Sequence, residues 1–335
     1  MEAAVLISPQ NNTSIVLSPE SQSNPGLTLV WNHGNYDVST EINYEIEAAA
    51  GGTNFADTLS INTVTARVYP LTVAELNSLA LQAGIEPFEE GKLDFRVVSS
   101  LGTAHEMKMV SNVISINVTP YTTENPKLFL RGNFTNASGY GADWGGTTTP
   151  PFLQAAAYGE TAFEGFIYMN VAEPEFKFIP NAVDFAGDYG DAAASGFSGT
   201  LVQEGETNIK PGAPGYYYIK ADTDLLTYSA VPTAWGVVGN ATPGGWENST
   251  PMTYDATTKK WTVTVALVPQ VAPDNGWKFR ANNAWTYNMG DTTLNSTDGT
   301  LKFDGTNIGV TTAGTYKITL DLSNPRAYSY TIERQ

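Results

Sequence analysis

The stretch LFLRGNFT at residues 128–135 returns as WGVVGNAT at residues 235–242, and FKF at 176–178 returns as WKF at 277–279. GTL at 199–201 matches GTL at 299–301, GYYYI at 215–219 matches GTYKI at 314–318, and Tyr228 matches Tyr328. The period is about 100 residues, which is too long for a solenoid unit and predicts tandem domains. Within each copy, short β-branched and aromatic runs separated by Gly, Pro and Asn predict strands and turns, so each copy should be a β-sandwich.

Residues 1–121 lack the repeat but have about seven short strand candidates, which favours an immunoglobulin-like sandwich. One helix interrupts them over residues 72–84, where Thr72 and Glu75 form a capping box and Gly84 provides the stop. The breaks TPYTTENP (119–126) and SAVPTA (229–234) have the composition of linkers. The predicted fold class is all-β, with an immunoglobulin-like spacer domain (1–121) followed by two carbohydrate-binding-like sandwich domains (126–230 and 232–335).

Composition excludes several classes of function. The chain has 335 residues, with 34 acidic and 17 basic ones, so its net charge is −17. Such a chain does not attract nucleic acid or anionic lipid through its overall charge. It has no cysteine and 2 histidines, which argues against thiol chemistry, a disulfide framework and a multi-histidine metal site. The aromatic content of 11% and hydrophobic content of 41% exclude general disorder.

The last domain has the residue types that bind sugars. Trp and Tyr offer rigid flat faces to the C–H side of a pyranose, and polar side chains bond its hydroxyls. Trp246 follows Pro-Gly-Gly, and Trp285 follows Asn-Asn-Ala, so both should lie in turns. In a strand, Lys278 and Arg280 share one face while Trp277 and Phe279 face the core. The candidate glycan-binding residues of this domain are Trp246, Trp285, Lys278, Arg280, Tyr287, Asn283 and Asn288.

An alternative is that these tryptophans plug the ends of the sandwich. The middle domain departs from the pattern at two positions, because Ile179 replaces Arg280 and Phe185 replaces Trp285. A phenylalanine can still stack on a sugar, but the guanidinium donor is missing, so we expect weaker binding there. Its candidate residues are Trp144, Lys177, Phe185 and Tyr189.

The carboxylates do not suggest catalysis. Asp184, Asp188 and Asp191 have a spacing that faintly resembles a calcium loop, but no EF-hand register or bidentate Glu accompanies them. A glycosidase needs two carboxylates across a cleft. The acidic residues matched between the repeats are Asp191 with Asp291 and Asp222 with Asp321. We therefore predict no enzymatic activity, no catalytic residue, no metal and no cofactor.

The order of features resembles a known family. VGNATPGGW at 238–246 followed by WKFRANNAWTYNMGD at 277–291, after a sandwich that contains LTVAELNSLALQAG, resembles the SusE/SusF-type outer-membrane starch-binding lipoproteins of Bacteroidetes, closest to SusE. The resemblance implies a non-catalytic cell-surface protein of a polysaccharide-utilisation system that binds starch. It also implies contact with other outer-membrane glycan-uptake proteins and a lipid anchor on an N-terminal cysteine.

The sequence opens directly into the strand-like AAVLIS, so we expect the signal and the anchor cysteine to be missing from it. Two other functions stay open at this point. One is a structural or adhesive multi-sandwich protein that contacts other proteins, and the other is a glycoside hydrolase. Aromatic loops alone do not distinguish α-1,4-glucan from β-1,3-glucan or mannan.

Overall fold

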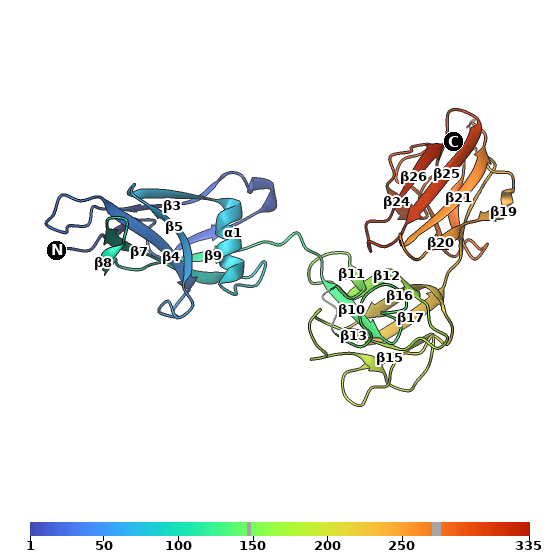
Figure 1. Ribbon diagram of the computed structural model, residues 1–335, viewed down its shortest axis with the longest axis horizontal. Coiled ribbons are helices and arrows are strands. Elements are labelled where there is room, and N and C mark those ends of the chain that lie inside the picture. Colours follow the sequence, from blue (N-terminus) through green and yellow to red (C-terminus); the bar gives the residue numbers. More distant parts are fainter. Residues whose placement is uncertain (146–148, 270–275) are drawn as a thin grey trace. The chain divides into compact units, whose positions relative to one another are not determined.

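The structure is a computed structural model that describes residues 1–145, 149–269 and 276–335. The chain forms two compact units, Met1–Thr123 and Glu124–Gln335 (Figure 1). The described residues are almost entirely strand and loop, which confirms the all-β prediction. The second unit holds both copies of the repeat, called here repeat A (126–230) and repeat B (232–335). The division into three domains remains a prediction from the sequence.

The first unit is a sandwich of two sheets. One has the order β1-β3-β6, and the other has the order β2-β9-β7-β4-β5 with β8 paired to β7. The strand β2 runs parallel to β9, and the other pairs are antiparallel. The elements are β1 (Leu6–Ser8), β2 (Thr13–Val16), η1 (Pro19–Ser21), β3 (Pro25–Trp31), β4 (Ile42–Ala50), β5 (Leu59–Val64), β6 (Val68–Thr72), α1 (Val73–Gln82), β7 (Gly91–Leu101), β8 (Glu106–Val110) and β9 (Ile114–Thr119).

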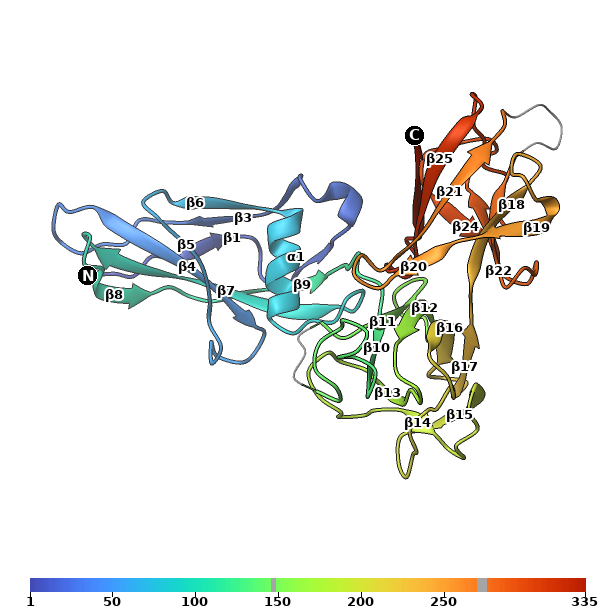
Figure 2. The ribbon, with the colours of Figure 1, turned by 45° about the vertical axis from the view of Figure 1, so that its right-hand side comes forward.

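The predicted helix is confirmed as α1, which follows β6 directly and packs against β3 and β6 (Figure 2). Its start is fixed by the predicted capping box. The Thr72 hydroxyl accepts from the Glu75 amide at 3.2 Å, and the Glu75 carboxylate accepts from the Thr72 amide at 2.7 Å. These bonds satisfy two backbone donors that a helix start leaves without partners.

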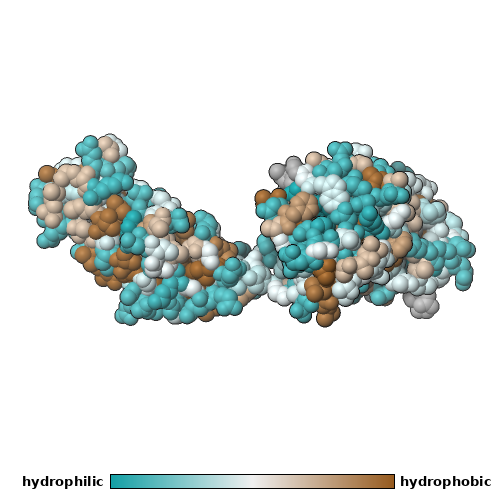
Figure 3. Space-filling model, turned by 90° about the horizontal axis from the view of Figure 1, so that it is seen from below, coloured by the Kyte–Doolittle hydropathy of each residue, from teal (hydrophilic) through white to brown (hydrophobic). Residues whose placement is uncertain are grey.

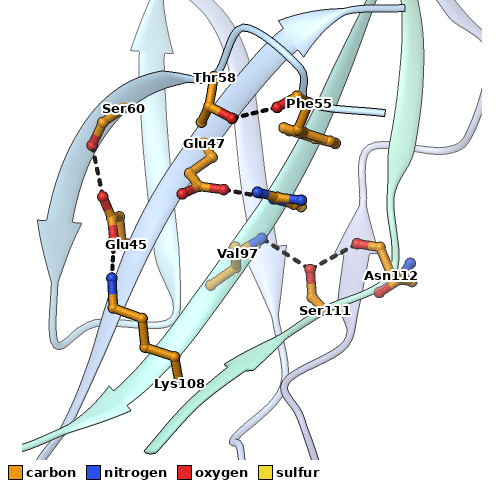
Figure 4. A network of polar contacts seen from close by, with 10 residues as sticks. Glu45, Glu47, Phe55, Thr58, Ser60, Val97, Lys108, Ser111 and Asn112 are labelled. Carbon is orange, nitrogen blue, oxygen red and sulfur yellow. Dashed lines mark hydrogen bonds and ion pairs between the residues drawn. The ribbon is translucent and has the colours of Figure 1, made fainter. Parts of the chain in front are cut away.

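Alternation along the strands separates the core of the first unit from its polar face. Trp31 is buried in the core, as expected, and lies 5.6 Å from Tyr44 between ring centroids. On the outer face of β4, Glu45 pairs with Lys108 at 3.4 Å (Figure 4). Both side chains are partly exposed to solvent, so this face of β4 belongs to the polar surface. An ion pair at such a surface contributes little stability.

Repeat A wraps one sheet of eight strands around its core, in the order β13-β10-β11-β12-β16-β17-β15-β14. An isolated bridge between Phe178 and Tyr189 joins β13 to the segment before β14, which brings the two ends of the sheet together. The strands are β10 (Lys127–Gly132), β11 (Phe152–Ala155), β12 (Ala162–Met169), β13 (Phe176–Ile179), β14 (Gly190–Asp191), β15 (Ser198–Val202), β16 (Gly215–Asp222) and β17 (Thr227–Pro232).

Repeat B divides the same plan into two sheets, β19-β18-β22-β23-β24 and β20-β21-β25-β26. The break arises because β19 pairs only with β18, while β20 pairs with β21. Trp277 and Phe279 are fully buried, as predicted. The strands are β18 (Trp235–Gly239), β19 (Gly245–Pro251), β20 (Thr253–Asp255), β21 (Lys260–Leu267), β22 (Lys278–Ala281), β23 (Asn288–Asp291), β24 (Leu301–Phe303), β25 (Gly314–Asp321) and β26 (Ser329–Arg334).

Aromatic side chains join the two repeats inside the second unit. Phe166 of β12 meets Trp235 at 5.8 Å and Tyr328 at 5.3 Å between ring centroids. Tyr216 of β16 meets Trp261 at 5.4 Å. These rings belong to the same buried cluster as the core of repeat B, so the apolar core of that repeat extends into repeat A. The outer surface of the unit is mostly hydrophilic on the face seen in Figure 3, with apolar residues in small separate groups.

The structure corrects one match between the repeats. The sequence comparison paired Tyr228 with Tyr328, but the Leu201 amide bonds the carbonyl of Leu226, and the Leu301 amide bonds that of Tyr328. Tyr228 therefore corresponds to Tyr330. The connection from β25 to β26 is longer than that from β16 to β17, and this insertion displaced the match.

The capping box gives a prediction for the stability of the first unit. Thr72→Ala removes the hydroxyl that accepts from the Glu75 amide, so it should lower the free energy of unfolding by about 1 kcal/mol. Thr65→Ala changes an exposed threonine outside the helix and serves as the control. Urea unfolding followed by circular dichroism measures both variants, and equal losses would show that the cap contributes nothing.

Candidate functional site

The candidate site of repeat B lies on one side of the sheet that contains β18, β19 and β22. Arg280 of β22 pairs in register with Gly236 of β18, and Pro251 of β19 pairs with Gly236 on its other side. A turn closed by the bond from the Gly245 amide to the Thr242 carbonyl leads into Trp246. The predicted turn therefore ends just before Trp246, which is the second residue of β19, whereas Trp285 lies in a turn as predicted. Gly245 has a φ of 58°, a conformation that glycine adopts at little cost, so the chain can reverse there.

Trp246 and Trp285 come together although they are far apart in sequence. Their ring centroids are 5.9 Å apart and their planes are inclined at 40°. Trp285 is 46% exposed, and Trp246 is half-buried. Two inclined indole faces at the surface form an apolar platform, since neither ring is inserted in the core cluster of the repeat. The expectation that these tryptophans plug the sandwich therefore does not fit their positions.

The guanidinium of Arg280 stacks on Trp285 and bonds the backbone beside Trp246. Its guanidinium carbon lies 4.8 Å from the centroid of the Trp285 ring. The same group donates to the carbonyls of Trp246 at 3.4 Å and Glu247 at 3.0 Å, and to the side chains of Ser249 at 2.9 Å and Asn283 at 2.5 Å. Because a guanidinium has five N–H groups, these four bonds leave one for a ligand.

Arg280 is only 3% exposed, and burial lowers its pKa, while the negative charge of Glu247 opposes that effect. From the sequence, we expected the Arg280 guanidinium to be a hydrogen-bond donor to the glycan. In the structure its main part is different: it joins β19, which carries Trp246, to the turn that carries Trp285, and it stacks against the Trp285 ring.

Lys278 makes one hydrogen bond through its ammonium within the described parts of the chain. Its ammonium has a long contact of 3.4 Å to the Asn288 side-chain oxygen. Asn288 is buried and donates to the Trp285 carbonyl at 3.1 Å and to Asp304 at 2.7 Å. Burial lowers the pKa of Lys278, and the charge of Asp304 opposes the change. Asn288 is thus a positioning residue that links the lysine to the loop of Trp285.

The other two predicted residues, Asn283 and Tyr287, make contacts within the protein. Asn283 accepts from Arg280 and from the Ser249 amide at 3.1 Å, so its side chain holds the loop in place. Tyr287 lies 5.2 Å from Tyr218 of repeat A and packs against the shared core. Within the described part of the chain, no ring contact joins Tyr287 to the tryptophan pair, so its place is at the junction of the repeats.

Repeat A has a hollow at the corresponding place. It has a volume of about 460 Å³ and is lined by Trp144, Lys177, Phe185, Asp188, Glu206 and Asn208. Three of these were predicted from the sequence. The fourth predicted residue, Tyr189, packs instead against the core of the repeat beside Phe178.

No role for Arg131 was predicted from the sequence. In repeat A, Ile179 stands where repeat B has Arg280, and Arg131 provides a guanidinium in its place. Arg131 of β10 is paired in register with Lys177 of β13, and its guanidinium carbon lies 5.8 Å from the Phe185 ring. It is 4% exposed and donates to the carbonyls of Ala182 at 2.8 Å and Val183 at 3.2 Å. The neighbouring strand therefore supplies the cation beneath the ring. The signal was present in LFLRGN, where an arginine stands at the strand position that Val238 takes in repeat B.

The matched acidic residues are structural. Asp191 is fully buried and accepts from the Tyr228 hydroxyl at 2.7 Å, and Asp291 accepts from the Tyr330 hydroxyl at 2.5 Å. Burial alone would raise the pKa of Asp191, but bonds from Tyr228 and the amides of Ala193 and Ser195 lower it. No cluster of metal-ligating side chains occurs among the described residues.

Comparisons with known proteins show which family the start of the chain is similar to. Residues 1–98 match the family model of SusE outer membrane protein, which confirms the resemblance to the SusE/SusF type. No curated protein matches the sequence significantly. The crystal structure of SusF from Bacteroides thetaiotaomicron is 17% identical and aligns over 98% of this chain and 77% of that chain, with a TM-score of 0.27. A likeness at that score establishes nothing about the sites.

The buried Asp191 gives a pH-dependent prediction. Because its pKa is lowered by folding, its contribution to stability is complete above the unfolded value of about 3.9 and is lost as the pH falls through the folded value. Tyr228→Phe removes one donor, so it should cost about 1–2 kcal/mol at pH 7 and much less once the carboxyl is protonated. Urea unfolding across this pH range measures the loss, and a loss that is independent of pH would contradict the assignment.

Arg280 gives a second prediction. Arg280→Lys keeps the charge but cannot reach two carbonyls and two side chains at once, so it should lower the free energy of unfolding of the second unit by about 2 kcal/mol. Lys302→Arg, the reverse exchange at an exposed position of β24, is the control and should change stability by less than about 0.5 kcal/mol. If Arg280→Lys is as stable as the control, the guanidinium does not hold the loops.

Proposed function

We propose that this chain is a non-catalytic glycan-binding protein of the outer membrane, with α-glucan as its ligand. The observation that carries the proposal is the tilted pair of Trp246 and Trp285, which is exposed at the surface and held by a buried guanidinium. The family match of residues 1–98 supports a place at the outer membrane, and the resemblance to starch-binding lipoproteins supports the glycan class.

The physical chemistry of the platform favours weak binding of single oligosaccharides. Each ring can remove on the order of 100 Å² of apolar surface from water, worth roughly 2.5 kcal/mol. Hydrogen bonds from Lys278 and from the remaining Arg280 donor add about 1 kcal/mol each. Association entropy offsets several kcal/mol of this gain, so the dissociation constant should be about 10 μM to 1 mM.

The absence of turnover is supported by the state of the carboxylates. A general acid needs access to the glycosidic oxygen, but the repeat-matched Asp191 and Asp291 are buried and bonded to tyrosines. Asp188 is held in an ion pair with Lys177 at 3.0 Å. We therefore propose that the protein retains glycans for other proteins of an outer-membrane uptake system.

Attachment to the membrane belongs to the same proposal. Among the described residues, no helix is long and apolar enough to cross a membrane. The resemblance supplies a lipid anchor on a cysteine, and this sequence has no cysteine. In this proposal the first unit acts as a spacer between the membrane and the repeats.

Affinity electrophoresis of the whole chain tests the proposal. The protein is run in three gels, which contain an α-1,4-glucan, a β-1,3-glucan or a mannan. We expect the gel with the α-1,4-glucan to retard it. Trp246→Ala/Trp285→Ala should abolish most of the retardation, because both faces of the platform are lost. Phe197→Ala removes an exposed aromatic ring outside both candidate sites and should leave mobility unchanged.

Thermal unfolding must show that the double variant is folded. Retardation by another polysaccharide would replace the ligand class, and no retardation in any gel would favour the structural or adhesive function. Reducing-end assays of the same mixtures test for catalysis. Sustained release of reducing ends that is lost on a single Asp or Glu substitution would overturn the non-catalytic proposal.

A further inference from the structure

The two repeats place a lysine at the same register but surround it differently. Lys177 of β13 pairs in register with Arg131 of β10, and Lys278 of β22 pairs in register with Val238 of β18. The amide of Asp191 bonds the carbonyl of Thr207, and that of Asp291 bonds the carbonyl of Thr306. These equivalent bonds show that Glu206 of repeat A occupies the position of Gly305 in repeat B.

In repeat A, two carboxylates hold the lysine. The Lys177 ammonium lies 3.0 Å from Asp188 and makes a still shorter contact with Glu206. All three side chains are largely buried, with exposed fractions of 20% for Lys177 and 13% for each carboxylate. Since an ammonium group has three hydrogens, two of them are used before any ligand arrives.

In repeat B, neutral groups replace both carboxylates. Asn288 stands where repeat A has Asp188, since Phe279 pairs with Met289 as Phe178 pairs with Tyr189. Gly305 has no side chain, and a Cβ there would meet the Gly290 carbonyl oxygen at 2.4 Å. Lys278 keeps its long contact with Asn288 and is influenced by the charge of Asp304, and its ammonium has no further hydrogen-bond partner among the residues that the structure describes.

The electrostatics of the two lysines differ accordingly. Burial alone would lower the pKa of Lys177, but its bonds to Glu206 and Asp188 raise the value above the ordinary one. The bond to Lys177 lowers the pKa of Glu206. The pKa of Lys278 is lowered by burial. A lysine that is already neutralised by two buried carboxylates loses those bonds if it turns toward a sugar hydroxyl.

We propose that Asp188 and Glu206 are specificity-determining residues that restrain Lys177, so that the hollow of repeat A binds glycan through Trp144 and Phe185 with little help from the lysine. This inference rests on the proposed function, because it concerns the ligand class named there. Repeat A is then the weaker of the two sites. Both repeats have a guanidinium against an aromatic ring, since Arg131 lies against Phe185, so the difference in affinity comes from Asp188 and Glu206.

The experiment uses the whole chain with the platform of repeat B removed by Trp246→Ala/Trp285→Ala. In that background, Asp188→Asn/Glu206→Gln should raise the affinity for maltoheptaose about five- to tenfold, because the charged Lys177 becomes free to donate. Glu204→Gln/Asp224→Asn, which also removes two negative charges but from exposed positions of the same repeat, is the matched control and should leave the affinity unchanged. Isothermal titration measures all three proteins.

A double-mutant cycle isolates the lysine. With the carboxylates present, Lys177→Ala should change the affinity less than twofold, and with Asp188→Asn/Glu206→Gln it should remove the whole gain. If the neutralised pair unfolds the repeat, Glu206→Gln alone keeps Asp188 as a partner of Lys177 and should give a smaller gain.

An unchanged or lower affinity in the folded neutral variants would overturn this inference. A large loss on Lys177→Ala in the presence of both carboxylates would also overturn it, because the lysine would then already bind the sugar. The proposed function fails separately, when the chain with all native residues is not retarded by any polysaccharide.

Discussion

A buried guanidinium is the group on which each candidate site depends. Arg280 is nearly inaccessible to water and bonds two carbonyls and two side chains in β19, which carries Trp246, and in the turn that carries Trp285. A charged group buried in this way is stable only when its hydrogen bonds are made, so the loops are fixed by the same bonds that satisfy the charge. The rings above it are presented as rigid surfaces, which limits the entropy lost on binding.

Repeat A reaches a similar arrangement from a different strand. Arg131 lies on β10 and Arg280 on β22, yet each places its guanidinium against the ring of the loop beyond the Lys-containing strand. Strands that are neighbours in a sheet bring side chains from distant sequence positions to one face. The physical requirement is a cation beneath an aromatic ring, and more than one strand position can meet it.

The junction of the repeats explains why residues predicted for binding lie elsewhere. Phe166, Tyr216 and Tyr218 cover one face of repeat A, and repeat B packs Trp235, Trp261 and Tyr287 against them. An aromatic residue close in sequence to a sugar-binding motif can either bind the glycan or pack in the buried interface between the repeats. The sequence pattern does not separate these two uses. Tyr287 shows this, because it follows Trp285 by two residues and yet faces the other repeat.

The sequence by itself determined the all-β class, the repeat, the capped helix, and the buried faces of Trp277 and Phe279. These follow from local rules, because alternation, capping and turn residues act over a few positions. Tertiary structure decided which donors remain free: it engaged four of the five N–H groups of Arg280, brought Arg131 under Phe185, and set two carboxylates against Lys177. Hydrogen-bond donors are shared among strands that the sequence keeps far apart, so their availability depends on register and burial, which only the folded chain fixes.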